Sequence, residues 1–488
     1  MMLQVLDKNS VNNRPHAENV TEKYLQKPFR ERISDPEFYK SLSKMKILAA
    51  PTGFGKTHAL TAKDGFIDEM FKMDVKGVMV SIPDTGIFPR RLRRKTIRNL
   101  SKSGHHCDMA IDMDDFINLL NDPEVDRVLY VAHASNFKPV RIDEILAVTT
   151  QVGFVADECH SWMCSHEDNY REVHGSSTTD YRKVLYNFAE RLSEYTPYVF
   201  GLTATATTEQ DDDYEGGRID VKGNLEFEII NTWPSPEHIL GRVAYLDKEV
   251  KFDIDNEEEV IDALSDYLSR IIYHNNTYKT KIAGAAWVGA DNVSTGYNQR
   301  WVLDKIQKLL LELNAFDDNG ENKQCVILTS DQQHQIVFLN KTSGRRWKFV
   351  KQDQDTILEN LRSHEAPQKI LIMKEKGKMG IDVPTIKSIF PLRKTEKLRS
   401  SQYTGVGITE AFLQRCGRSF RLNLTGDILK AVEENGYCLE GIIEMLDKKQ
   451  RKEFYESNAI MVYVPKGNIM VEDGLRRILS KPYCLTLA

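Results

Sequence analysis

Long apolar segments are absent from this sequence. No stretch of about 20 apolar residues occurs, which is the length that a membrane-spanning helix needs. The first residues, Met1 to Lys8, also lack the apolar core typical of a secretory signal. We therefore expect neither secretion nor a membrane span.

Cysteine is scarce and scattered, with seven in 488 residues. The closest pair, Cys159 and Cys164, does not have the spacing of a zinc site. Neither a disulfide framework nor a metal cluster is expected. Reduced thiols favour a cytoplasmic location, which for a viral protein means the host cytoplasm, and a nuclear location stays open.

A general excess of positive charge is also missing, because the net charge is -5. Binding of nucleic acid would therefore depend on local patches such as Arg90-Arg-Leu-Arg-Arg-Lys95. Such a run is equally typical of a solvated helix face. The hydrophobic fraction of 41% and the charged fraction of 28% are ordinary for globular proteins, so composition decides neither for nor against an enzyme.

A glycine-rich turn is the most informative feature that is present. Ala50-Pro-Thr-Gly-Phe-Gly-Lys-Thr57 follows an apolar run typical of a buried strand and precedes residues typical of a helix. Gly53 and Gly55 would let main-chain N–H groups approach phosphates, Lys56 would bring a cation, and Thr57 would place a hydroxyl on Mg²⁺. The general pattern begins with Gly, where this chain has Ala50. We expect ATP to contact the turn and the first helical residues: Pro51, Thr52, Gly53, Phe54, Gly55, Lys56, Thr57 and His58.

A pair of carboxylates provides the second half of an ATP-hydrolysing site. Asp157 and Glu158 end the apolar run that starts at Val152, so they would emerge at the carboxyl edge of a parallel sheet. Asp157 would hold Mg²⁺ together with Thr57, and Glu158 would orient and deprotonate the attacking water. Alone, such a pair is typical of a solvated strand end; together with the glycine-rich turn it predicts nucleotide hydrolysis.

The order of apolar runs predicts two α/β domains after a polar, helical lead-in at residues 1–44. Strand-like runs alternate with helical stretches in residues 45–234 and again in 235–424, which favours mostly parallel sheets covered on both faces. Residues 425–488 change in character and are expected to form a small appendage. The expected strands are 46–50, 77–82, 128–132, 152–156, 198–202, 282–288, 324–328, 369–373 and 386–390.

An arginine motif in the second domain completes the pattern. Gln414-Arg-Cys-Gly-Arg-Ser-Phe-Arg421 places Arg418 and Arg421 three residues apart, on one helical face. Two guanidiniums so spaced would neutralise charge that develops on the γ-phosphate. An arginine-rich helix is otherwise typical of a salt-bridged surface.

Together these segments resemble superfamily two helicases and translocases of the DExH type. The resemblance covers about residues 45 to 425 in the family's motif order: AxxGxGKT at the turn, Asp157-Glu-Cys-His160, Thr203-Ala-Thr205, Gly380-Ile-Asp-Val-Pro384 and QRxGRxxR. It implies two tandem RecA-like domains, ATP and Mg²⁺ as cofactors, Asp382 on the nucleotide, and Gln414, Arg418 and Arg421 in catalysis. It also implies that nucleic acid is held by its backbone, through Ser81 to Arg91, His133 and Thr203 to Thr205.

The departures from the family pattern decide finer points. Gln26 stands in a poor match to the segment that reads adenine, which leaves the base selectivity open. Thr203, where RNA helicases of the family usually have Ser, favours the DNA-directed branches of recombination-type and restriction-type enzymes. The leading interpretation is thus an ATP-driven helicase or translocase, and this residue favours DNA over RNA as its substrate. An ATP-switched clamp without strand separation, or the motor subunit of a nuclease assembly, remain alternatives, and the oligomeric state stays open.

Overall fold

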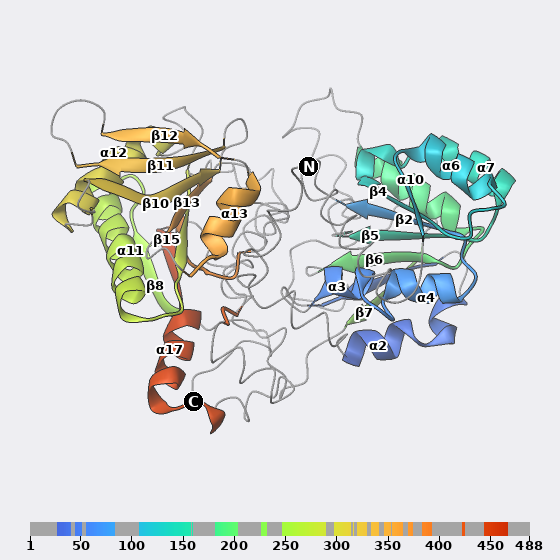
Figure 1. Ribbon diagram of the computed structural model, residues 1–488, viewed down its shortest axis with the longest axis horizontal. Helices are drawn as coiled ribbons and strands as arrows, with labels where there is room; N and C mark the ends of the chain where they lie inside the picture. Colours follow the sequence, from blue (N-terminus) through green and yellow to red (C-terminus); the bar gives the residue numbers. More distant parts are fainter. Residues whose placement is uncertain are drawn as a thin grey trace, which may run out of the picture. The chain divides into compact units, whose positions relative to one another are not determined.

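The computed structural model describes residues 27–40, 44–50, 55–82, 107–157, 159, 181–203, 226–231, 246–288, 297–313, 316, 320–328, 333–340, 346–352, 354–364, 369–373, 383–392, 422–424 and 444–466. The chain divides into two compact units. The first consists of Val20–Pro234 and Gln402–Gly407, and the second of Met1–Asn19, Ser235–Ser401 and Ile408–Ala488. Each unit has its own sheet with helices packed on it (Figure 1).

The first unit contains a seven-stranded sheet in the order β3-β4-β2-β5-β6-β1-β7, with every pair parallel. Parallel neighbours need crossover connections, which here carry the helices. The strands are β1 (Lys44–Ala49), β2 (Gly77–Ile82), β3 (Asp108–Ala110), β4 (Val128–His133), β5 (Val152–Asp157), β6 (Val199–Thr203) and β7 (Glu226–Asn231). The helices are α2 (Lys27–Ile33), η1 (Pro36–Tyr39), α3 (Lys56–Thr61), α4 (Phe66–Lys72), α6 (Met113–Asn121), η2 (Ala134–Asn136), η3 (Pro139–Arg141), α7 (Ile142–Val148) and α10 (Tyr181–Ser193).

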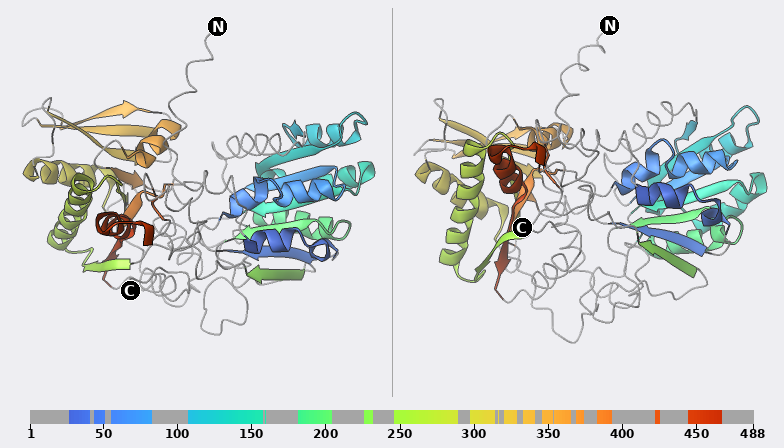
Figure 2. Two further views of the ribbon diagram at one scale, coloured as in Figure 1. Left: turned by 60° about the horizontal axis from the view of Figure 1, so that its bottom comes forward. Right: turned by 90° about the horizontal axis from the view of Figure 1, so that it is seen from below.

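Alternation along the central strands creates two cores, one on each face of this sheet. Met45 and Ile47 of β1 pack with the apolar residues of α6, α7 and α10, whereas Leu48 packs with those of α2, α3 and α4. Figure 2 shows these two groups of helices on opposite faces. Because both faces are covered, the strands read as continuous apolar runs, which is why the sequence reveals them.

Residues 27–40 belong to the second of these cores rather than to a polar lead-in. Phe29, Ile33, Phe38 and Tyr39 are buried, and the Phe38 ring stacks on Phe200 of β6 at 5.2 Å between centroids. The Tyr39 hydroxyl donates to the Ile33 carbonyl at 2.6 Å. The segment is too short for a clear helical period, so its few apolar side chains do not stand out from the polar sequence around them.

The second unit contains an eight-stranded sheet in the order β12-β11-β10-β13-β9-β14-β15-β8. Its pairs are parallel except β10–β11 and β11–β12. Apolar residues of α11 and α12 form one core with residues of this sheet. The elements are β8 (Leu246–Phe252), α11 (Glu257–Thr277), β9 (Ala283–Trp287), α12 (Gln299–Glu312), β10 (Glu321–Leu328), β11 (Gln333–Leu339), β12 (Trp347–Lys351), α13 (Gln354–Arg362), β13 (Ile370–Met373), β14 (Ile386–Pro391), α17 (Lys448–Asn458) and β15 (Ile460–Pro465).

The predicted fold class is confirmed: the chain forms two tandem RecA-like α/β units, each around a mostly parallel sheet. All nine expected strands are present, as β1, β2, β4, β5, β6, β9, β10, β13 and β14. The exact domain limits stay predictions, with a second correction beside that of residues 27–40. Ile460–Pro465, expected in an appendage, is instead the buried strand β15 between β14 and β8. Both partner strands lie far away in the sequence, and a local apolar run does not indicate which strands it will pair with.

Two histidines, His274 buried and His364 partly buried, lie near the amino edge of the second sheet. His274, in the last turn of α11, bonds through Nε2 to the Thr280 carbonyl at 2.9 Å, and burial lowers its pKa to about 4. His364 accepts the Lys281 N–H at Nδ1 at 2.9 Å. Burial, with the charges of Lys369 and Lys281, lowers the pKa of His364 to about 4 as well. Both imidazoles are therefore neutral in the folded protein at neutral pH.

These histidines predict a loss of stability on mild acidification. In the unfolded chain they take up protons below a pKa of 6.5, whereas the folded state resists until about 4. Over this range the unfolded state binds more protons, so the free energy of unfolding falls as pH falls, by up to about 1.4 kcal/mol per pH unit for each histidine. Urea unfolding between about pH 7 and 5 measures this slope.

His364→Asn is the control for that measurement, since an amide oxygen can still accept the Lys281 N–H but does not titrate. In this variant the free energy of unfolding should depend less steeply on pH, because one histidine no longer contributes. An unchanged slope would assign the pH dependence to other groups.

Candidate nucleotide-binding site

The glycine-rich turn lies where β1 ends and α3 begins. Gly55 caps α3 with φ 97° and ψ 25°, in the left-handed region that favours glycine. Lys56 is the first residue of α3 and is buried, and its Nζ donates to the Ala50 carbonyl at 2.9 Å. Thr57 follows in the same helix, and His58 is buried there. Of the predicted nucleotide contacts in this turn, Pro51, Thr52, Gly53 and Phe54 lie outside the described residues.

The predicted carboxylate Asp157 is the last residue of β5 and is buried. Two positions later the Cys159 N–H donates to the Leu202 carbonyl of β6 at 3.1 Å, and the Cys159 side chain is buried. Glu158 and His160 lie outside the described residues. The chain on either side of Glu158 is therefore fixed against β6.

Strand β6 joins the two halves of the site. It lies between β1 and β5, with Ala49 opposite Thr203 and Asp157 opposite Leu202. The Ala50 N–H also donates to the Thr203 carbonyl at 3.0 Å. Ala50 thus connects Thr203 to Lys56, since its carbonyl accepts the lysine bond. The turn and the carboxylate strand end together at one carboxyl edge, where ligands bind in open α/β sheets.

These residues fit a magnesium nucleotide. A positive-φ glycine lets a phosphate approach the turn closely, and the Lys56 ammonium lies on the Ala50 carbonyl. A buried carboxylate ends β5, which is separated from β1 by β6 alone. Oxygen ligands such as Asp157 suit Mg²⁺. Asp157 would hold the metal with Thr57, and Lys56 would hold the terminal phosphates.

Gly201 in β6 shows how tightly the two halves are packed. A Cβ at this position would come within 2.7 Å of Cys159 Sγ and 2.9 Å of Met45 Cε. We expect Gly201→Ala to lower stability by about 1–3 kcal/mol and to reduce ATP turnover of the folded enzyme, because Cys159 must move and Glu158 is its neighbour. Thermal unfolding and the turnover rate measure the two effects.

Gly153→Ala in β5 is the matched control. Its Cβ would meet Met70 Sδ at 2.6 Å, which is part of a flexible side chain, and the position lies at the opposite end of β5 from Asp157. Stability should fall but turnover per folded molecule should not. Equal turnover in the two variants would disconnect Gly201 from the site.

In the second unit the structure fixes the neighbours of two predicted site residues. Val383 follows Asp382, and at the start of β14 Thr385 accepts the Ala283 N–H through its carbonyl at 2.7 Å. Asn423, two positions after Arg421, donates through Nδ2 to the Lys281 carbonyl at 3.0 Å. Both segments therefore meet the start of β9. Asp382, Gln414, Arg418 and Arg421 themselves lie outside the described residues.

The residues predicted to hold nucleic acid divide into three groups. Ser81 and Thr203 are buried, at 2% and 0% exposure, so neither hydroxyl offers a surface to a strand here. His133 ends β4 and its Nδ1 lies 2.9 Å from Ser135 Oγ, at the same carboxyl edge as Asp157. Residues 83–91, Ala204 and Thr205 lie outside the described residues, as does Gln26.

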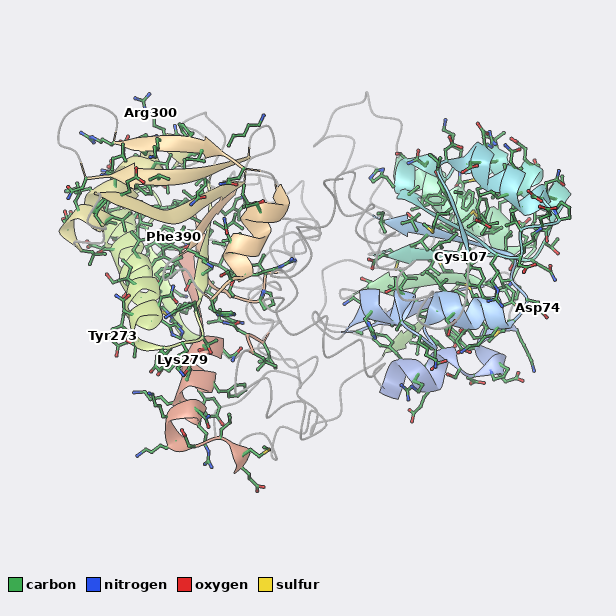
Figure 3. The ribbon with its side chains drawn as sticks, in the orientation of Figure 1. Asp74, Cys107, Tyr273, Lys279, Arg300 and Phe390 are labelled. Atoms are coloured by element: carbon green, nitrogen blue, oxygen red, sulfur yellow. The ribbon has the colours of Figure 1, made fainter. Side chains whose placement is uncertain are left out.

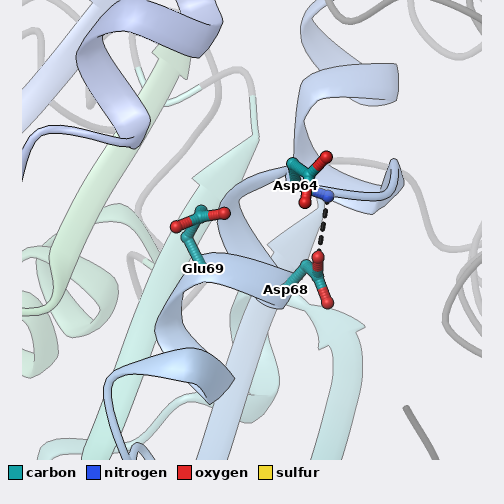
Figure 4. A group of neighbouring side chains, drawn as sticks. All are labelled: Asp64, Asp68 and Glu69. Carbon is teal, nitrogen blue, oxygen red and sulfur yellow. Dashed lines mark hydrogen bonds between the residues drawn. The ribbon is translucent and has the colours of Figure 1, made fainter. Parts of the chain in front are cut away.

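An acidic cluster between α3 and α4 is a different feature that the sequence did not reveal. Figure 4 shows Asp64, Asp68 and Glu69 close together, with the Asp64 N–H donating to Asp68 Oδ2 at 2.7 Å. The Lys72 ammonium lies 2.7 Å from Asp64, 2.7 Å from Glu69 and 3.1 Å from Asp68, and its hydrogen bond lowers the pKa of Asp64. One lysine thus bridges the three carboxylates and offsets part of their negative charge.

Comparison with known proteins finds similar solved structures but no matching sequence family. No family model matches the chain, and no curated protein matches it. Among solved structures, S. cerevisiae Dbp5 bound to RNA and ADP BeF3 has 15% identity and a TM-score of 0.44 over 96% of this chain and 100% of that one. Mss116p bound to ssRNA and AMP-PNP has 12% identity and a TM-score of 0.47 over 97% and 84%. The helicase MrfA bound to DNA has 10% identity and a TM-score of 0.47 over 95% of this chain and 54% of that one. Likenesses at these identities and scores carry no conclusion about activity.

Within the described residues, no helix has the length and apolarity to cross a bilayer. Cys107 and Cys159 are thiols rather than disulfides, and burial raises the pKa of Cys107 to about 11.

Proposed function

We propose that this protein is an ATP-dependent nucleic-acid helicase or translocase of the DExH type. The observation that carries the proposal is the carboxyl edge of the first sheet. There Ala50 links the lysine turn to Thr203, and β6 holds Asp157 beside that turn. The strand order, with one strand between the turn and the carboxylate, supports the proposal that both halves bind one ligand.

The proposed roles follow from the chemistry of each group. Lys56 binds the terminal phosphates, Thr57 and Asp157 orient the metal, and Glu158 takes the proton of the attacking water. The bound Mg²⁺ supplies neutralisation of charge on the phosphates. Buried Thr203 connects these groups through its main chain, which suits a relay between the site and the rest of the unit.

The second unit is proposed to contribute Asp382, Gln414, Arg418 and Arg421. Support comes from the described neighbours of these motifs. Asn423 lies within about 8 Å of Arg421 along the chain, because two residues span at most that distance, and Val383 is adjacent to Asp382. Thr385 and Asn423, which follow the two motifs in the chain, both bond to the segment Lys281–Ala283. Convergence of distant motifs is expected of a shared site.

The proposed partner is nucleic acid held by its backbone, with DNA favoured by Thr203, and the proposed location is cytoplasmic. The first test is ATP turnover with single-stranded DNA, duplex DNA, forked DNA and RNA side by side. Stimulation by any nucleic acid supports the motor, and stronger stimulation by DNA supports the finer proposal. Turnover that no nucleic acid changes would contradict both.

Strand-separation assays distinguish the motor from a clamp. A helicase or translocase releases a strand or displaces a bound protein only while ATP is hydrolysed, whereas a switched clamp binds and releases without separating strands. The third alternative, a motor subunit of a nuclease assembly, predicts translocation without cleavage by this chain alone.

Glu158→Gln should separate binding from hydrolysis. The amide can still hydrogen-bond the attacking water but cannot accept its proton, so we expect ATP binding to persist while turnover falls strongly. The variant should also retain nucleic acid longer in the presence of ATP. Nucleotide affinity and turnover, measured in parallel, test this; a parental rate of hydrolysis would remove Glu158 from its role.

A further inference from the structure

Helix α17 carries a strongly basic surface that the proposed mechanism does not use. Its buried side consists of Phe454, Ser457 and Asn458, which face the second unit. Four exposed basic residues occupy the remaining arc at its amino-terminal half. These residues, here called the α17 basic face, are Lys448, Lys449, Arg451 and Lys452.

The carboxylates near this face are largely turned to other partners. Asp447 caps the helix by accepting the Gln450 N–H at 2.8 Å, and Glu453 accepts the Thr280 N–H at 2.7 Å. Glu444 and Glu456 are exposed nearby. Across the part of the chain that the structure describes, no ion pair joins the four basic side chains to a carboxylate. Arg451 donates through Nε to the Leu446 carbonyl at 2.7 Å, which leaves its outer guanidinium nitrogens available.

The position of these cations is unfavourable for the isolated helix. Lys448 and Lys449 lie in its first turn, which contains no acidic residue. The amino end of a helix carries partial positive charge, so cations there lower helix stability and anions raise it. An anionic partner bound at this end would therefore raise the stability of the helix.

Two groups at the end of α11 extend the surface. Figure 3 labels Tyr273 and Lys279, which precede His274 and Thr280 in the chain, and the His274 Nε2 lies 3.4 Å from Ser457 Oγ of α17. Tyr273 is 66% exposed, which leaves its ring open for stacking, and Lys279 is exposed as well. The turn that carries Lys279 contacts α17 through the bond from the Thr280 N–H to Glu453. Lysines interleaved with an exposed aromatic ring are typical of surfaces that follow a nucleic-acid backbone.

We propose that the α17 basic face, with Lys279 and Tyr273, is a second contact surface for single-stranded nucleic acid, separate from the carboxyl edge of the first sheet. The proposal rests on the proposed function only in its choice of partner. The lysines bind phosphates without reading sequence, and Tyr273 stacks on a base. The buried side of the same helix holds Asn423, since Asn458 Oδ1 accepts the Asn423 N–H at 2.6 Å. The surface therefore lies one helix away from the chain segment that follows the arginine motif.

The test measures binding of fluorescein-labelled single-stranded DNA by anisotropy, without nucleotide, over a series of KCl concentrations. In the triple variant Lys448→Gln, Lys449→Gln, Lys452→Gln, three phosphate contacts are lost. We expect the affinity to fall by about tenfold or more. The negative slope of log K against log salt should become less steep by about 2, as the loss of three contacts to a single strand requires. The thermal midpoint should not fall, because cations leave the helix start.

The control is the triple variant Lys308→Gln, Lys348→Gln, Lys351→Gln, which removes the same charge from exposed lysines on α12 and β12. An equal loss of affinity in this control, or an unchanged slope in the α17 variant, overturns the proposal. Tyr273→Ala should weaken binding about fivefold or more while leaving the slope unchanged, because stacking releases no counterions. A Tyr273 variant that binds as the parent does removes this residue from the surface.

These outcomes separate the surface from the motor. If the parent binds DNA but hydrolyses no ATP, the proposed function is wrong. The salt slope of the α17 variant still tests whether the α17 basic face contacts DNA. If ATP hydrolysis is stimulated by DNA and the α17 variant keeps its slope, the motor stands and the surface falls. If the parent binds no single-stranded DNA or RNA at any salt concentration, both are wrong.

Discussion

Lys56→Ala is expected to abolish ATP turnover while the protein stays folded. Lys56 begins α3 directly after the left-handed Gly55, and its ammonium lies on the Ala50 carbonyl at the end of β1. Loss of a cation on transferred phosphates removes electrostatic stabilisation that is usually the largest single contribution to the rate.

The effect on folding should be small by comparison. The substitution removes one hydrogen bond to a main-chain carbonyl, which contributes about 1 kcal/mol. Lys63→Ala is the matched control, since Lys63 is an exposed lysine in the turn that follows the same helix. Steady-state turnover and thermal unfolding should be measured for both variants. Normal turnover in Lys56→Ala would show that the glycine-rich turn does not bind the phosphates of ATP.

Much of this fold could be predicted from the sequence because its central strands are covered on both faces. The strands β2, β4, β5 and β6 are largely apolar, β1 is interrupted by Lys46, and residues of the proposed site stand at the ends of several of them. Position in the chain then translates into position at the sheet edge, since parallel strands all end on the same side. That rule alone predicts that Lys56 and Asp157 lie at the same edge of the sheet.

Other elements could not be predicted, for physical reasons that differ. The edge strand β12 reads Trp-Lys-Phe-Val-Lys, with three of its five side chains exposed, and so lacks a continuous apolar signal. Strand β15 is apolar, but its pairing with β14 and β8 depends on long-range register that no local pattern encodes. The burial of Ser81 and Thr203 is likewise a tertiary property, because a hydroxyl on a strand is polar in sequence wherever it points.

Hydrogen-bonded asparagines illustrate the same limit in the second unit. Asn423 and Asn458 are ordinary polar residues in sequence, yet both are buried and bond to each other's main chain or side chain. Buried amides require partners, and here the partners come from segments far apart in the chain. The anchoring of the segment after Arg421 is therefore visible only in the structure.

Arg418→Lys is expected to reduce nucleic-acid-stimulated ATP turnover by up to about 10³-fold, the scale of an arginine finger. Lysine keeps the charge but lacks the planar fork that grips two phosphate oxygens, so even this mild change should be severe. Affinity for Mg·ATP should change less than turnover, because the grip matters most when charge develops in the transition state. Arg421→Lys should behave in the same way, since both residues stand in one motif whose end is fixed through Asn423.

Arg300→Lys provides the comparison, because Arg300 is an exposed arginine on α12 of the same unit (Figure 3). A surface arginine contributes less than about 1 kcal/mol, so this control should change the stimulated rate by no more than about twofold. If Arg418→Lys and Arg421→Lys change the rate as little as the control does, the arginines belong to a solvated helix face. The second unit would then play no part in hydrolysis, and the motor proposal would fail even with Lys56 and Asp157 in place, because those two residues account for nucleotide binding and not for its coupling to a second domain.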